Sequence, residues 1–130
     1  MPAALMHHET DPATEIFAEL GDISNVDLYF SSVLVAVYLR PEKTKSGIYY
    51  SDKTRDEDRY QGKVGLVVKI GPRAFVDDGE AVFHGQTVNV GDWVVYRPSD
   101  GWNVTINKRL CRILNDVDIK ARVPAPDVIW

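Results

Sequence analysis

From residue 26 onward the sequence is a succession of short apolar segments, each closed by a turn signal. β-Branched and aromatic residues, which favour strands, dominate these segments. Glycine, asparagine or aspartate separates one segment from the next. Strands at a spacing of roughly 8–12 residues with such turns are typical of a small barrel or sandwich. We therefore predict an all-β fold built from VDLYFSSVLVAVYLR (26–40), VGLVVKIG (64–71), RAFVDDGEAVF (73–83), TVNVGDWVVYRP (87–98), SDGWNVTI (99–106), RLCRIL (109–114) and DVDIKARV (116–123).

Size and composition limit the chain to one globular domain with short appendages. It has 130 residues, of which 45% are hydrophobic and 26% charged, as in ordinary globular proteins. No apolar run approaches the ~20 residues that span a bilayer, and the first ten residues lack the basic start and apolar core of a secretory signal. A single cysteine, Cys111, excludes an internal disulfide framework and a cysteine-rich zinc site. We expect a cytoplasmic or virion setting and no membrane partner.

The negative charge of the chain is concentrated at its start. The formal net charge is −4, while residues 1–22 hold five acidic residues and no Lys or Arg, so residues 23–130 sum to +1. Neither part has the basic excess of a nucleic-acid-binding surface, and we expect no nucleic-acid partner. The sequence thus divides into an acidic arm (1–22), a β-barrel (23–123) and a tail (124–130).

The arm carries the only helix signal of the chain. Asp11 is a suitable N-cap, Pro12 suits the first helical position, and Gly21 is placed to end the helix. Ile16, Phe17 and Leu20 would share one face. A helix of about nine residues is marginal alone, so this face either packs on its own barrel or reaches a neighbouring subunit.

Residues that could carry catalysis or bind a metal do not form a recognisable set. His7 and His8 are adjacent and therefore do not share a face of a regular element, and His84 is expected in an exposed turn. Cys111 lies in a predicted strand, where a buried thiol is the default interpretation. We therefore predict no catalytic residue, no metal site and no cofactor, and we do not expect an enzyme.

The most informative stretch is the charged segment between the first two predicted strands. Residues 42–63 contain eleven charged residues in 22 positions around the apolar tripeptide Ile48-Tyr49-Tyr50. Such a stretch cannot bury much surface and is expected to be a long loop. The tripeptide either folds back as an edge strand or is a recognition segment that orders on a partner. In the second case weak contacts require several copies at once, and a ring-shaped homo-oligomer supplies them.

Residues 33 to about 123 resemble the small co-chaperonins of the GroES family. The resemblance rests on the order of the strand VLVAVYLR, the run Thr-Lys-Ser-Gly-Ile (44–48), GKVGLVVKIGP, Asp-Asp-Gly-Glu (77–80), VNVGDWVVY and RLCRILNDVDIKARV. It implies an irregular antiparallel β-barrel, commonly assembled as a seven-membered ring. The added N-terminal arm, the tail and the long charged loop are similar to what phage- or prophage-encoded members carry.

The resemblance also implies roles for particular residues. Ile48, Tyr49 and Tyr50 would bind a large chaperonin ring, with Ser46 and Gly47 as the loop hinge. A roof-like hairpin formed by Asp77, Asp78, Gly79 and Glu80 would close the folding chamber. ATP would be used by the chaperonin partner only.

A second hypothesis is a virion structural protein that reuses the same barrel. In that case the arm and tail, through Ile16, Phe17, Leu20 and Trp130, would clamp neighbouring subunits or phage capsid proteins. A host-cytoplasmic co-chaperonin remains the first hypothesis.

Overall fold

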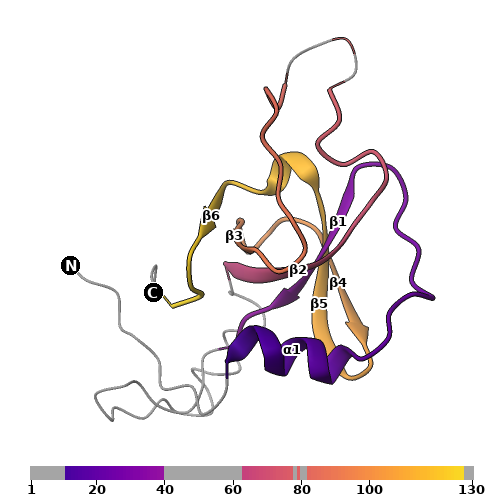
Figure 1. The fold of residues 1–130 in the computed structure, drawn as a ribbon, viewed down its shortest axis with the longest axis vertical. Coiled ribbons are helices and arrows are strands. Elements are labelled where there is room, and N and C mark those ends of the chain that lie inside the picture. Colours follow the sequence, from indigo (N-terminus) through magenta and orange to yellow (C-terminus); the bar gives the residue numbers. More distant parts are fainter. Residues whose placement is uncertain (1–10, 40–62, 78, 80–81, 128–130) are drawn as a thin grey trace.

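Six antiparallel strands form one curled sheet in the computed structural model, which describes residues 11–39, 63–77, 79 and 82–127 (Figure 1). The strand order is β4-β5-β1-β2-β3-β6, and every neighbouring pair is antiparallel. The predicted all-β class is therefore confirmed. The elements are α1 (Pro12–Leu20), β1 (Ser32–Val37), β2 (Val64–Ile70), β3 (Trp93–Val95), β4 (Trp102–Ile106), β5 (Arg109–Asn115), the 3₁₀ helix η1 (Asp116–Asp118) and β6 (Ala121–Val123).

Strand β1 is the centre of the sheet. It pairs with β2 on one side and β5 on the other, and its side chains from Val33 to Val37 have no exposed surface. Alternate residues of β1 enter two separate apolar clusters, with Leu34 and Ala36 in one and Val33 and Val35 in the other. A strand buried on both faces needs a continuous apolar run rather than an alternating one, which is the pattern of this segment.

Helix α1 covers one face of the sheet. The Asp11 carboxylate accepts a hydrogen bond from the backbone N–H of Thr14 (3.1 Å), and Gly21 ends the helix with a positive φ of 61°. The side chains of Ile16 and Leu20 are buried in the same cluster as Leu34. The predicted helix and its caps are confirmed, and these two side chains pack on their own barrel. Within the described ranges no helix is both long enough and apolar enough for a bilayer span.

Polar contacts fasten α1 to the turn between β4 and β5. Asn107 and Lys108 both have positive φ, as the central residues of a two-residue hairpin turn require. The Asn107 side-chain amide donates to the carbonyl oxygen of Leu20 (2.5 Å), and the Arg109 guanidinium donates to the Glu19 carboxylate (3.0 Å). The hairpin turn thus holds the C-terminal half of the helix.

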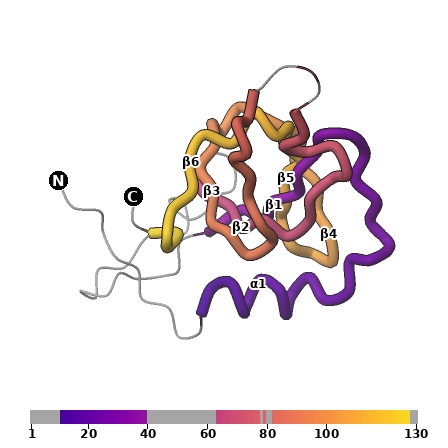
Figure 2. Tube along the Cα trace, turned by 45° about the horizontal axis from the view of Figure 1, so that its top comes forward, coloured from indigo at the N-terminus to yellow at the C-terminus, as the bar shows by residue number. Residues whose placement is uncertain are grey.

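The segment predicted as a β-hairpin at residues 73–83 departs from that prediction. The described residues of this range form turns and bends, with Phe75 in the left-handed region, and no ladder joins its two limbs; His84, directly after it, also has a positive φ. We call residues 73–89 the roof segment, after the role predicted for residues 77–80. Its described part projects from the barrel at the end opposite α1 (Figures 1 and 2). Residues 26–31, expected to be extended, also form no strand, because a turn joins the backbone N–H of Ser32 to the carbonyl of Tyr29 (3.3 Å).

Replacing Leu20 by Ala should detach or loosen α1. The side chain is 1% exposed, and truncation of a buried leucine typically costs about 2–5 kcal/mol. We expect the midpoint of urea unfolding to fall accordingly. The control is Ala18→Ser on the exposed side of the same helix, which should change the free energy of unfolding by less than about 0.5 kcal/mol. Equal midpoints for the two variants would contradict the docking of α1.

Candidate functional site

The segment that carries the predicted recognition tripeptide lies outside the described residues. Ser46, Gly47, Ile48, Tyr49 and Tyr50 all belong to residues 40–62, none of which the structure describes. The described residues on either side, 38–39 and 63–64, are the flanks of this segment. These flanks adjoin the paired ends of β1 and β2, where Val37 lies opposite Gly65. The two flanks are therefore held side by side by the sheet.

The flanks are fixed by backbone hydrogen bonds. The N–H of Tyr38 donates to the carbonyl of Val64 (3.0 Å), and the N–H of Tyr96 donates to the carbonyl of Lys63 (3.0 Å). The Tyr38 ring packs edge-on against Trp93, with ring centroids 5.7 Å apart. Both flanks of residues 40–62 are therefore fixed on the barrel by hydrogen bonds and packing.

Arg109 joins the end of β1 to helix α1. Its guanidinium donates to the carbonyl oxygen of Val37 (2.8 Å) and to the carboxylate of Glu19 (3.0 Å). The Arg109 side chain is only 14% exposed, whereas that of Glu19 is 42% exposed, so water still screens part of this charge-assisted pair. Sequence reasoning missed this residue, since its two partners are 72 and 90 positions away.

Asp77 links the two sides of the roof segment through hydrogen bonds. The Asp77 carboxylate accepts hydrogen bonds from the backbone N–H groups of Phe83 (2.8 Å) and His84 (3.2 Å). The rings of Phe75 and Phe83 meet edge-on at 5.4 Å. Gly79 has a positive φ of 88°. Of the predicted roof residues, Asp78 and Glu80 lie outside the described part.

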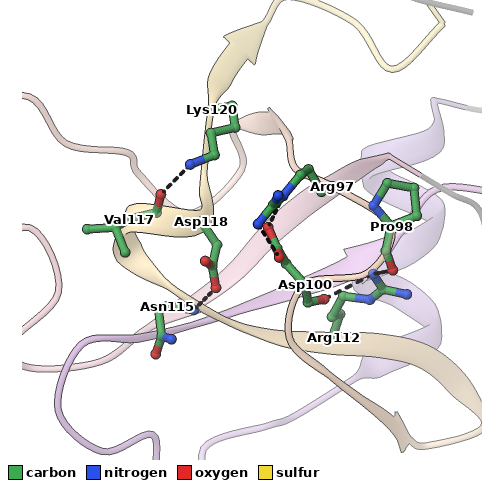
Figure 3. Close-up of polar contacts among 8 residues, drawn as sticks. All are labelled: Arg97, Pro98, Asp100, Arg112, Asn115, Val117, Asp118 and Lys120. Carbon is green, nitrogen blue, oxygen red and sulfur yellow. Dashed lines mark hydrogen bonds and ion pairs between the residues drawn. The ribbon is translucent and has the colours of Figure 1, made fainter.

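Asp116 anchors the roof segment to the end of β5. Its carboxylate is buried and accepts from the backbone N–H groups of Phe75 (3.0 Å) and Val117 (2.7 Å). Two side chains cap the adjacent 3₁₀ helix η1 (Figure 3). The Asp118 carboxylate accepts a hydrogen bond from the backbone N–H of Asn115 (2.9 Å). The Lys120 ammonium group donates to the backbone carbonyl of Val117 (3.1 Å). Sequence reasoning took this stretch as strand and missed the run Asn-Asp-Val-Asp as a helix-capping signal.

Arg112, a buried residue of β5, binds the backbone of the turn between β3 and β4. Although only 2% exposed, it donates to the Asn103 side chain (3.0 Å) and to the carbonyls of Pro98 and Asp100 (Figure 3). Its guanidinium also lies 5.4 Å from the centre of the Tyr96 ring. The buried positive charge of Arg112 is thus stabilised by three oxygen acceptors and by the face of the Tyr96 ring. We assign Arg112 a structural role.

The single cysteine of the chain, Cys111, has a thiol that burial keeps protonated. Cys111 is buried in β5, and burial raises the pKa of its thiol to about 11, so the thiolate is scarce at neutral pH. His84 is exposed in the roof segment. No group of three or more His, Cys, Asp or Glu in the described part of the chain could hold a metal ion.

The comparisons with known proteins agree with this architecture. The profile of the chaperonin 10 kDa subunit family matches residues 26–123, three quarters of the chain. The chain belongs to this family. The match spans β1 to β6, the segment 40–62 and the roof segment, whereas α1 lies outside it.

Curated relatives in this chaperonin 10 family support the same assignment. The co-chaperonin GroES of Syntrophomonas wolfei is 32% identical over 82 residues, covering 63% of this chain and 79% of the relative. The co-chaperonins GroES of Chloroherpeton thalassium and Halothermothrix orenii are 34% and 36% identical over 80 residues, covering 62% of this chain and 78% and 77% of those relatives. The predicted resemblance to the GroES family is thus confirmed. The phage or prophage origin remains a prediction.

Stability should decline at alkaline pH. In the folded chain burial raises the pKa of Cys111 from its ordinary value of 9.0 to about 11, and that of Tyr96 from 10.0 to about 12. The unfolded chain therefore releases these protons first, and the free energy of unfolding falls as pH rises from about 9 to about 12. Urea unfolding at pH 7.5 and 10.5 measures this.

The variant Cys111→Val provides the control for this pH dependence. It removes one of the two titrating groups while keeping an apolar side chain at that position. The difference in unfolding free energy between the two pH values should shrink in this variant. An unchanged difference would show that Cys111 does not contribute.

Proposed function

We propose that this protein is a co-chaperonin: a ring-forming lid that binds the open end of a large ATP-dependent chaperonin and assists protein folding. The observation that carries the proposal is the family match across residues 26–123, with relatives described as co-chaperonins. Its partner would be a large chaperonin ring. ATP would be bound and hydrolysed by that partner, so the role requires no catalytic residue in this chain.

The arrangement of the barrel supports two separate tasks at its two ends. Strand β1 begins beside the roof segment, where the N–H of Gly71 donates to the carbonyl of Ser32 (2.7 Å), and ends where residues 40–62 leave the barrel. A binding segment at one end and a roof at the other is the layout that a lid requires. The sheet lies between these two ends and separates residues 40–62 from the roof segment.

Residues 40–62 have the composition of a segment that binds by ordering. An apolar tripeptide, Ile48-Tyr49-Tyr50, lies in a strongly charged stretch whose two ends are fixed on neighbouring strands. Ordering entropy weakens each such contact, and a homo-oligomeric ring offsets this by presenting several segments at once. Ser46 and Gly47 would provide the hinge for this ordering.

The co-chaperonin hypothesis is preferred over the virion hypothesis. The curated relatives reported above are co-chaperonins, and Ile16 and Leu20 of the arm are buried in their own barrel rather than presented to a neighbour. Phe17 is 38% exposed, and Trp130 lies outside the described residues. We place the protein in the cytoplasm together with its chaperonin partner.

The variant Ile48→Asp should abolish binding to the chaperonin. A charge in the apolar tripeptide would have to be desolvated in the partner's groove. We expect the wild-type protein to co-sediment with a large bacterial chaperonin in the presence of nucleotide, and the variant to remain in the supernatant. The melting temperature and oligomeric state should be unchanged.

The matched control is Ser51→Asp, which adds the same charge just beyond the tripeptide. It should retain most of the nucleotide-dependent co-sedimentation. Failure of the wild-type protein to co-sediment under any nucleotide condition would contradict the proposed function. A large loss of thermal stability in Ile48→Asp would instead place Ile48 in the folded core.

A further inference from the structure

Helix α1 lies beside the end of β1 and is fastened there by polar contacts (Figure 1). The family match covers residues 26–123 and does not include this helix. The side-chain amide of Asn107 donates to the carbonyl of Leu20 (2.5 Å). The ammonium group of Lys69, on β2, donates to the carbonyl of Ile23 (3.1 Å), just after the helix. The helix is therefore a fixed part of this barrel, and the family match alone does not explain its presence.

One side chain connects α1 to the flank of the proposed binding segment. The Arg109 guanidinium donates to the Glu19 carboxylate (3.0 Å) and to the carbonyl oxygen of Val37 (2.8 Å), the last residue of β1. The pairing of β1 with β5 ends one residue earlier, at Ala36. The Arg109 side chain therefore supplies a donor to a carbonyl group that lies just beyond the end of this ladder. The chain that follows Val37 is the N-terminal flank of residues 40–62.

Arg109 keeps this position at a cost in stability. Its Nε atom is buried and has no hydrogen-bond acceptor among the described residues. A buried donor without an acceptor destabilises the folded state. Arg112, on the same strand, has three oxygen acceptors and an aromatic ring. A side chain selected for stability alone would resemble Arg112, so the two contacts of Arg109 indicate a further role.

We propose that Arg109 is a positioning residue for chaperonin binding, oriented by Glu19 of α1 so that it fixes the direction in which the chain leaves β1. This rests on the proposed function, in which residues 40–62 bind the chaperonin, and it adds the contact that controls their binding. A segment that orders on its partner loses less conformational entropy when its attachment is already fixed. Helix α1 thereby strengthens chaperonin binding from within its own subunit.

The first variant is Arg109→Lys, which keeps the positive charge but loses the planar fork that reaches two acceptors. The dissociation constant for a large bacterial chaperonin should rise roughly tenfold in co-sedimentation with nucleotide, because every copy in the ring loses the same contact. Circular dichroism and sedimentation velocity should show the wild-type fold and oligomeric state. An unchanged dissociation constant would overturn this inference and leave the proposed function intact.

The matched control is Arg112→Lys, the same substitution at another buried arginine of β5. The contacts of Arg112 described above involve neither Val37 nor α1. This variant should lower the midpoint of urea unfolding at least as much as Arg109→Lys, and it should bind the chaperonin with the wild-type dissociation constant. Equal losses of affinity in the two variants would attribute the effect to general destabilisation and overturn the positioning role.

The variant Glu19→Gln tests whether α1 acts through Arg109. The Glu19 side chain is 42% exposed, so this variant also serves if Arg109→Lys does not fold. Its dissociation constant should rise by a smaller factor, roughly threefold, because glutamine still accepts a hydrogen bond but carries no charge. The double variant should bind no more weakly than Arg109→Lys alone, since both changes act on one contact. Additive losses would overturn the role of Glu19.

Hydrogen exchange at the flank gives a readout that does not involve the chaperonin. The backbone N–H of Tyr38 donates to the carbonyl of Val64 (3.0 Å). It should exchange faster in Arg109→Lys than in either the wild-type chain or Arg112→Lys, because only the first variant loosens the flank. A wild-type exchange rate in Arg109→Lys would overturn this inference. A wild-type protein that does not bind the chaperonin would overturn the proposed function and this inference with it.

Discussion

The burial of β1 on both faces is the interaction on which the rest of the structure depends. Five consecutive side chains of this strand, from Val33 to Val37, have no exposed surface. One face is covered by α1 and the strands around it, and the other by residues that lead into the roof. Because interiors are close-packed, a shift of β1 would displace both clusters at once. The flanks of residues 40–62 and the base of the roof are positioned by this single strand.

Features decided by neighbouring residues could be predicted from the sequence. Asp11, Pro12 and Gly21 determine where α1 begins and ends through contacts within four positions, and the structure has the same bounds. The apolar runs at residues 33–37 and 64–68 likewise determine strands. Local chemistry of this kind requires no knowledge of the tertiary fold.

Features decided by distant residues could not be predicted. The roof segment was expected to form a ladder, yet Asp77 and Asp116 satisfy its backbone N–H groups instead. Arg112 looks like a surface residue in the run RLCRIL, and only the turn carried by β3 and β4 makes its burial possible. In each case the partner of a polar group is brought in by the fold, and buried polar groups must find such partners.

The side-by-side attachment of residues 40–62 has a consequence for how sequences of this kind can diverge. Closing a chain between two fixed points costs conformational entropy that grows only logarithmically with its length, so that doubling the length costs about 0.6 kcal/mol. The pairing of Val37 with Gly65 holds the two flanks of this segment together. Insertions and substitutions in this segment can therefore accumulate at little expense to the fold. A change in the length of residues 40–62 therefore costs the pairing of β1 with β2 little.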